Sequence, residues 1–450
     1  MTEILALLQN IAPLLAPTTV RQLSHVIFGM LVASGRITML GLSRWTEKGG
    51  SYRTIQRLYH SGLPWKALQW LFFRERFWKP EDEYLVAGDE VVVSKAGKQT
   101  YGLDRFFSGV QHQVIPSLSF FTFSLVNVRE EQSYPMQATP MVKSAEAKAA
   151  SQAKAEAKKV QKTAEPKKPG RPKGSQNKGK QAVVLKPELL RIQKALHSLL
   201  ATVGTTIPLK YVVLDGHFGN YPSAFMVRLA NLHLISKLRS DAALYPVFEG
   251  EHRGRGPKPK YGAKLEVHHL DANYLKDTSI EGQLRTDIYQ GQFYNKEFAF
   301  LLNVVIILKT ILETQAQAHV ILFSTDLEQA YTKIIKFYSL RFQIEFNFRD
   351  AKQYFGLEDF MNVKETAVTN AANLSLFMVN FSAALLQSFR QQNPEDSILD
   401  LKSHYRGYRY ASETIKMLPE KPDAILLADI FQQVARLGAI HPLLQPSASP

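Results

Sequence analysis

The stretch YSLRFQIEFNFRDAK, residues 338–352, combines residue types that catalyse reactions and bind anions. On a single helix, at about 100° per residue, four polar side chains fall in a strip roughly 60° wide: Tyr338, Arg341, Glu345 and Lys352. A carboxylate on a largely apolar helix face needs a cationic partner or a metal ion. Two interpretations of Glu345 therefore stand. It is either an ion-pair partner of Arg341 at the i,i+4 spacing, or a metal ligand among cations that face a polyanion.

The metal interpretation requires further carboxylates, and two apolar segments supply them. Asp89 lies in YLVAGDEVVV, and Asp215 follows KYVVL. An apolar run that leads to one acid is typical of a buried central strand that delivers this acid to a site. Three carboxylates from separate elements can hold two Mg²⁺ ions, which assist phosphoryl transfer. Asp104 in YGLDRFF is the weaker candidate for the first acid, because no clean apolar strand precedes it.

The composition points to a nucleic-acid partner. The 450 residues suffice for two or three domains and include 55 Lys and Arg against 40 Asp and Glu, a net charge of +15. The lack of cysteine excludes disulfides, thiolate metal sites and a cysteine nucleophile, and it suits a reducing cytoplasm. The N-terminus has no basic region typical of a secretory signal, and the apolar run 298–308 is too short to span a bilayer. We therefore expect a soluble, cytoplasmic protein.

Local patterns predict an α/β chain. Strands are expected in three runs between residues 84 and 128, and in KYVVL, HLISKL and HVILFS, whereas residues 245–310 read as irregular and partly stranded. Helices are expected over residues 1–80 and from a cap at Ser324 to about residue 390. The predicted regions are a helical DNA-binding domain (1–80), a first core segment (84–240), a β-rich insertion (241–310), a second core segment (311–390) and a helical C-terminal region (391–450).

Two basic segments are candidates for DNA contacts. SRWTEKGGSYRTIQRLYHSG has the outline of a helix-turn-helix, whose second helix offers Arg53 and Arg57 to base edges or phosphates. The alternative is an ordinary helical hairpin with a solvated basic face. Residues 143–182 form a low-complexity linker that is rich in Lys and, in its second half, too polar and rich in Pro and Gly to fold alone.

That linker contains PGRPKG, which has the Gly-Arg-Pro core of an AT-hook. Arg171, next to Lys173, would enter the narrow minor groove of AT-rich DNA. The alternative is a nonspecific polycation that binds any phosphate backbone. A looser copy, RGRGPK, occupies residues 253–258.

The spacing of Tyr338, Arg341, Glu345 and Lys352 matches the Y-(2)-R-(3)-E-(6)-K signature, and the chain resembles bacterial insertion-sequence DDE transposases of the insertion-sequence-four-like superfamily. The resemblance covers roughly residues 84–390 and includes SKAGKQTYGLDRFFSG and HLISKLRSDAALY. It implies a ribonuclease-H-like core, in which a mixed sheet is flanked by helices. It also implies that Asp89, Asp215 and Glu345 form the catalytic, metal-binding triad, with Mg²⁺ as the cofactor and Mn²⁺ as a substitute.

The resemblance also implies a substrate and a reaction. Double-stranded DNA would be cut at transposon ends and joined to target DNA, with a hairpin intermediate as one route, by a homodimer assembled on DNA. Tyr338, Arg341 and Lys352 would hold the end DNA, and Arg349 points near them. The alternatives are a nuclease of the same fold that joins no strands and a non-catalytic DNA-binding descendant. We expect a bacterial cytoplasmic protein that associates with the nucleoid when it is bound to DNA.

The chain departs from these relatives at two places. Asp89 is followed by Glu90 and Val91, where many relatives have Asp-Asp-Thr or Asp-x-Thr. Because neighbouring strand residues point to opposite faces, Glu90 is not expected to be a ligand. The basic linker is also longer than is usual in the group. His217, two residues after Asp215, is interpreted as a loop histidine.

Overall fold

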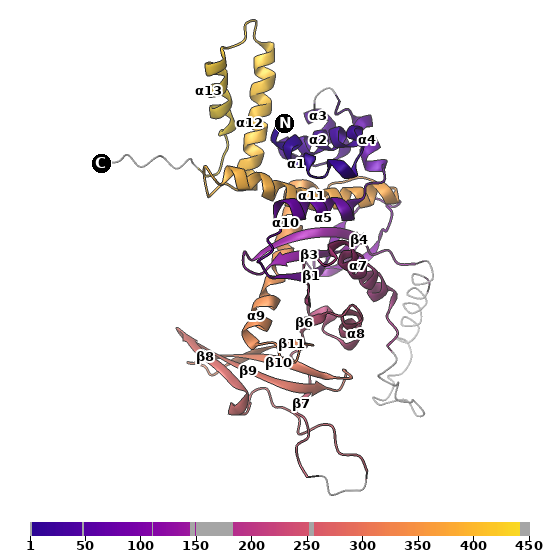
Figure 1. Cartoon of the computed structure of the whole chain (residues 1–450), viewed down its shortest axis with the longest axis vertical. Coiled ribbons are helices and arrows are strands. Elements are labelled where there is room, and N and C mark those ends of the chain that lie inside the picture. Colours follow the sequence, from indigo (N-terminus) through magenta and orange to yellow (C-terminus); the bar gives the residue numbers. More distant parts are fainter. Residues whose placement is uncertain are drawn as a thin grey trace, which may run out of the picture.

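The structure, a computed structural model, describes residues 2–46, 49–109, 111–144, 149, 183–251 and 256–441. As predicted, it is a mixed α/β fold in which helices flank one large mixed sheet (Figure 1). Most of the basic linker, with Arg171 and Lys173, lies outside the described residues, as do residues 253–255 of the second Gly-Arg segment.

The sheet has the strand order β2-β3-β1-β5-β6-β11-β10-β9-β7, with β4 added to β3 and β8 added to β9. The pairs β1–β5 and β5–β6 are parallel, and the remaining pairs are antiparallel. The strands are β1 (Tyr84–Ser94), β2 (Asp104–Ser108), β3 (Gln113–Asn127), β4 (Gln132–Pro140), β5 (Tyr211–Leu214), β6 (His233–Lys237), β7 (Leu244–Tyr245), β8 (Leu275–Glu281), β9 (Leu284–Asn295), β10 (Leu301–Ile311) and β11 (Gln317–Ser324).

The predicted strands are found, and the structure adds others. β4 contains Pro135 and Pro140, which weaken a strand pattern and are tolerated here because β4 pairs with β3 alone. Residues 275–311 are more regular than predicted. β9 and β10 pair continuously from Leu284↔Ile311 to Tyr294↔Leu301 and extend the central sheet. This antiparallel hairpin imposes an order that local composition did not indicate.

Helices cover both faces of the sheet and form both ends of the chain. They are α1 (Thr2–Gln9), α2 (Pro17–Val32), α3 (Met39–Trp45), α4 (Tyr52–His60), α5 (Trp65–Arg76), α7 (Pro187–Val203), α8 (Tyr221–Leu229), α9 (Tyr331–Leu340), α10 (Gln343–Phe355), α11 (Glu365–Phe389), α12 (Ile398–Met417) and α13 (Ala424–Ala435). The predicted helical N-terminus is found, and α7 is a helix that was not predicted. Figure 1 shows α12 and α13 as a hairpin that projects away from the sheet.

The segment 338–352 is not one helix, so the prediction of a single continuous helix is wrong. α9 ends at Leu340 and α10 begins at Gln343, and the intervening N–H groups of Arg341 and Phe342 bond to carbonyls three residues earlier. This tight turn lets α9 pack on β5, β6, β10 and β11, while α10 packs on β1, β4 and α11. Packing of the two halves against different elements thus overrides the continuous helical pattern.

Helix α11 is the central helix of the core, between the N-terminal helices and the sheet (Figure 1). It has the length and hydropathy of a membrane span, but 78% of its most apolar window is buried inside the protein, as in the core helix of a soluble protein. Its amides also satisfy the free edge of β4: Asn373 exchanges hydrogen bonds with the Ala138 backbone, and Asn380 donates to the Pro135 carbonyl. This covering removes an exposed strand edge.

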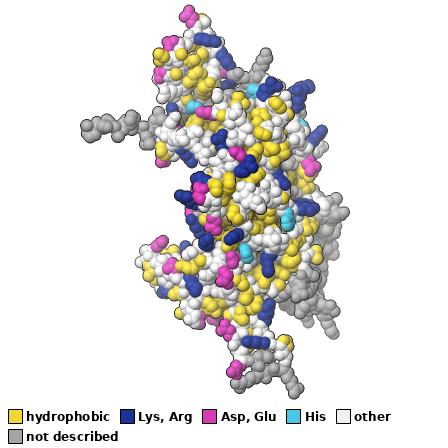
Figure 2. All heavy atoms as spheres, in the orientation of Figure 1, with side chains coloured by type: hydrophobic (Ala, Val, Ile, Leu, Met, Phe, Trp, Pro, Cys, Tyr) yellow, Lys and Arg dark blue, Asp and Glu magenta, His cyan; other side chains and the backbone are white. Residues whose placement is uncertain are grey.

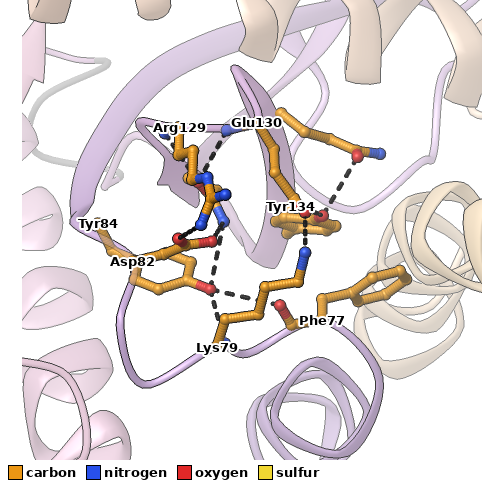
Figure 3. Close-up of polar contacts among 9 residues, drawn as sticks. Phe77, Lys79, Asp82, Tyr84, Arg129, Glu130 and Tyr134 are labelled. Atoms are coloured by element: carbon orange, nitrogen blue, oxygen red, sulfur yellow. Dashed lines mark hydrogen bonds and ion pairs between the residues drawn. The ribbon is translucent and has the colours of Figure 1, made fainter.

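A polar cluster fixes the start of β1 where the N-terminal helices lead into the sheet (Figure 3). The Tyr84 hydroxyl accepts from the Lys79 backbone N–H and donates to the Phe77 carbonyl. Lys79 forms an ion pair with Glu130, and Arg129 lies 3.5 Å from Asp82. Because these contacts join the α5–β1 connection to the β3–β4 turn, they set the position of β1, which carries Asp89.

Lys402 joins three parts of the chain. From α12 its ammonium donates to the carbonyls of Met30 and Tyr354, which lie in the last turns of α2 and α10. Such carbonyls lack helical partners and favour a cation. Burial, with a smaller effect of Arg406, nevertheless lowers the pKa of Lys402 to about 7.

We expect this lowered pKa to make stability depend on pH. Between pH 7 and 10, the unfolded lysine holds a proton that the native lysine largely lacks, so the free energy of unfolding rises with pH. From pH 7.5 to 9.5, wild type should gain roughly 2 kcal/mol relative to Lys402→Met. Denaturant unfolding of both proteins at the two pH values measures this difference. A difference that is independent of pH would contradict the lowered pKa.

Candidate active site

The register of two parallel strands brings the first two acids together. β1 and β5 pair from Val86↔Val212 to Gly88↔Leu214, so Asp89 and Asp215 occupy the next neighbouring positions. β5 ends there, whereas β1 continues to Ser94. The two acids therefore occupy neighbouring positions where β5 ends. The apolar runs before them predicted the two strands, and the register of β1 with β5 brings the acids together.

Close packing before Asp89 requires a glycine. A Cβ at Gly88 would lie 2.7 Å from Leu214 Cδ2 and 2.8 Å from Phe123 Cε1. These distances are shorter than real contacts, so with a larger residue at position 88 the buried side chains of Leu214 and Phe123 would have to shift. Gly88 thus permits these two side chains to pack over β1 next to Asp89.

Asp89 is held in an environment that disfavours its charge. Burial is the main cause that raises its pKa to about 6, and the charges of Asp215 and Glu345 add to this effect. The Arg341 guanidinium and the Glu90 backbone N–H oppose it. The electrostatic effect of both other acids on Asp89 indicates that all three acids share one site.

Arg341 bridges two of the three acids. One terminal nitrogen lies 2.8 Å from Asp89 Oδ2, and the other lies 3.0 Å from Glu345 Oε1. The Arg341 side chain is 14% exposed and that of Glu345 is 42% exposed. The predicted i,i+4 ion pair between Arg341 and Glu345 is therefore found, together with a second contact to Asp89. The two interpretations of Glu345 are thus compatible.

The carboxylates of Asp89, Asp215 and Glu345 are of the type that binds a divalent cation, although they are not arranged as a formed metal site. Among the residues that the structure describes, no group of three His, Asp or Glu side chains forms a ready metal site. Asp215 Oδ1 is nevertheless buried and has no hydrogen-bond partner. A buried carboxylate oxygen without a donor is costly, and Mg²⁺ prefers such oxygens. The residues present therefore fit a divalent cation, provided that Arg341 moves.

Two further signature residues lie at the same site. Tyr338 stands on α9 with its ring 6.0 Å from the Arg341 guanidinium, and burial raises the pKa of its hydroxyl. Lys352 lies 2.8 Å from Glu358 and donates to the Val92 carbonyl, three residues beyond Asp89 on β1. The helix break thus keeps the whole signature on the side of β1 that carries Asp89.

Other predicted DNA contacts lie on the surface. Arg349 is 57% exposed, pairs with Asp350 at 3.0 Å and stacks over Phe346. Arg53 and Arg57 are exposed on α4, which follows α3 as the helix-turn-helix outline predicted. On the face shown in Figure 2, Lys and Arg side chains are interspersed with acidic ones and form no single basic patch.

Three residues that were weighed for the site lie elsewhere. Asp104 of β2 pairs with Ser117 of β3, and Ser117 pairs with Ser94 of β1. Asp104 is therefore level with Ser94, five residues beyond Asp89 on β1, and it lies beside Lys143. The Glu90 carboxylate accepts a hydrogen bond from the Ser119 hydroxyl, and burial and the charge of Glu188 on α7 raise the pKa of Glu90. These partners lie on the opposite face of the sheet from Arg341. His217 is exposed and lies 3.9 Å from Glu188.

A family model described as DDE superfamily endonuclease matches residues 10–287. The chain belongs to this family. The match includes Asp89 and Asp215 and ends before Glu345. No curated protein matches the chain. DDE superfamily endonucleases act on DNA and typically use a divalent metal, in agreement with the DNA partner and the metal cofactor expected from the sequence.

The structure of this DDE endonuclease also gives a role to residues that the sequence did not single out. After α10, Gly356 adopts φ +72°, a left-handed conformation that favours glycine. Asp359 then accepts from the Ile37 N–H at 2.9 Å and lies 3.7 Å from Arg36. Through these contacts, the segment that follows α10 holds the N-terminal helices next to the end of α10.

Proposed function

We propose that this DDE endonuclease is a DNA transposase that cleaves DNA at transposon ends and joins the ends to target DNA. The observation that supports this most is the alignment of Asp89 with Asp215 on parallel strands, with Glu345 linked to Asp89 through Arg341. The transposase signature at residues 338–352 favours strand joining over simple hydrolysis. We propose Mg²⁺ as the cofactor, with Mn²⁺ as a substitute, and a bacterial cytoplasmic location.

In this proposal, the three acids hold the divalent ions and the cations hold DNA. Divalent ions bound there would supply charge stabilisation for the attacking and leaving oxygens of phosphoryl transfer. Tyr338, Arg341 and Lys352 would orient the end DNA, with Arg349 next to them on the surface. The core would be ribonuclease-H-like, with residues 1–80 as a DNA-binding domain and a homodimer holding two ends.

The test uses the full-length protein, Mg²⁺, a labelled duplex with the sequence that flanks the gene, and a supercoiled target plasmid. We expect nicks at the end and labelled plasmid that carries the joined end. A denaturing gel would also reveal a hairpin, if the reaction takes that route. Cleavage without joined product would instead support a nuclease of the same fold. Binding without cleavage would support a non-catalytic relative.

The N-terminal helices provide a separate prediction. Replacing both Arg53 and Arg57 with alanine should weaken binding of end DNA, because each exposed arginine on α4 contributes a phosphate or base contact. If both arginines contact phosphates, the slope of log affinity against log salt should become less steep by about the amount that two phosphate contacts contribute. Fluorescence-anisotropy titrations at several salt concentrations measure this slope. Replacement of exposed Arg239, on the β6–β7 connection, provides the control.

The basic linker adds a second DNA contact to the proposal. If Arg171 and Lys173 form a minor-groove hook, Arg171→Ala should cost more affinity on AT-rich than on GC-rich duplexes, because only the AT-rich groove is narrow. Titrations of both duplexes measure the difference. Equal losses would leave the linker as a nonspecific tether.

A further inference from the structure

Arg341 occupies the place where the acids would have to receive a cation. It is held from two sides, by Asp89 of β1 at 2.8 Å and by Glu345 of α10 at 3.0 Å. Its Nε is buried and has no hydrogen-bond partner. The guanidinium is thus a single positive charge shared by two carboxylates, and its Nε donor is unused.

The same carboxylate oxygens are needed for a divalent cation. A cation shared by Asp89 and Glu345 would take the space of the guanidinium, and two positive groups at that distance would repel each other. Asp215 differs from these two acids, because its Oδ1 is buried and has no hydrogen-bond partner. It could bind the cation without first losing a contact at that oxygen. Arg341 is therefore the group that has to move before the three acids can act together.

The position of Arg341 allows such a movement. It lies in the turn between α9 and α10, outside the regular hydrogen bonding of both helices, and beside the Tyr338 ring. A guanidinium that leaves buried acids needs another anion. A DNA phosphate offers two oxygens in the geometry that Arg binds bidentately.

We propose that Arg341 is an exchangeable counter-ion that couples DNA binding to metal binding. In the free protein it holds Asp89 and Glu345. When DNA enters, it transfers to a phosphate and frees both acids for the divalent cation. This inference rests on the proposed function for its DNA partner. Because coupling between two ligands is reciprocal, bound metal also strengthens DNA binding.

The test measures Mn²⁺ binding directly, by electron paramagnetic resonance of the free ion, with full-length protein. Without DNA, Arg341→Gln is expected to bind Mn²⁺ about tenfold more tightly than wild type, because the competing charge is gone. A duplex with a pre-cleaved end, which has no bond left to cut, should tighten Mn²⁺ binding to wild type by a similar factor. It should leave the affinity of Arg341→Gln within about twofold.

Two variants separate this coupling from general charge effects. Lys336→Gln removes a positive charge from α9, close to the turn that holds Arg341, but Lys336 pairs with Glu131 rather than with the three acids. It should leave Mn²⁺ affinity near wild type. Glu345→Gln should weaken Mn²⁺ binding, which would show that the ion binds at these acids.

Two results would overturn the proposal. One is Mn²⁺ binding to Arg341→Gln that is no tighter than to wild type without DNA. The other is an equal effect of DNA on both proteins. If Arg341→Gln does not fold, Arg341→Met serves instead, since methionine also removes the positive charge that competes with the ion. Failure of the protein to cleave or join DNA would refute the proposed function. The comparison of Mn²⁺ affinity between wild type and Arg341→Gln without DNA would still test the role of Arg341.

Discussion

Asp89→Asn, Asp215→Asn and Glu345→Gln are each expected to reduce metal-dependent DNA cleavage by about a thousandfold or more. Each change keeps the shape of the side chain and removes the negative charge that would hold a divalent cation. Binding of end DNA, measured without divalent ions, should change little, because most of that affinity comes from phosphate contacts elsewhere. Single-turnover cleavage and a parallel binding titration measure the two quantities on the same preparations.

The matched control is Asp104→Asn. Asp104 is also a strand acid that follows aromatic and apolar residues, but it lies beside Lys143 and far along β1 from Asp89. Its replacement should leave cleavage within about twofold of wild type, as for most surface changes. Full cleavage by any of the three triad variants would remove that residue from the site. Loss of cleavage in Asp104→Asn would mean that the first acid is misassigned.

The largest expected effect on stability belongs to Asn370. This buried α11 residue accepts from Trp65 Nε1 at 2.7 Å and donates to the carbonyls of Tyr59 and Ser61. Asn370→Leu would leave three buried polar groups without their partner, each costing about 1–3 kcal/mol. We expect the free energy of unfolding to fall by about 3–5 kcal/mol, because the end of α4 and the start of α5 lose their contact with α11.

Chemical denaturation followed by tryptophan fluorescence measures this loss, and Trp65 reports the junction directly. Asn273→Leu, at an exposed position, is the control and should change stability by less than about 0.5 kcal/mol. A small effect of Asn370→Leu would show that the N-terminal helices are held on α11 by apolar packing alone. In that case the tilted ring contact of Trp65 with Phe377 would be the next one to remove.

Much of the chemistry followed from the sequence, because residue types and their local spacing carry it. The apolar runs before Asp89 and Asp215 predicted buried strands, and both form β-strands of the central sheet. The i,i+4 spacing of Arg341 and Glu345 predicted their ion pair, which survives at 3.0 Å although the helix is broken before Gln343. Helix and strand patterns of this kind depend on neighbours within a few residues.

Other features were decided only by tertiary structure. The side-by-side position of Asp89 and Asp215 depends on the register of β1 and β5, strands separated by more than a hundred residues. No local pattern encodes this register, which follows the burial of the β1 and β5 faces. The contact of Arg341 with Asp89 arises in the same way, from packing of α10 on β1.

The break between α9 and α10 shows most clearly what the sequence determined and what the tertiary structure decided. Residues 338–352 have a helical period throughout, and each half is helical, so the sequence determined the kind of structure and the order of the polar side chains. Burial of Phe337 and Leu340 against the sheet and of Phe348 and Phe355 against other elements decided where the helix turns. Packing the apolar faces of α9 and α10 against different elements outweighs the less favourable i to i−3 hydrogen bonds of Arg341 and Phe342, since burying one such side chain contributes about 1.5–3 kcal/mol.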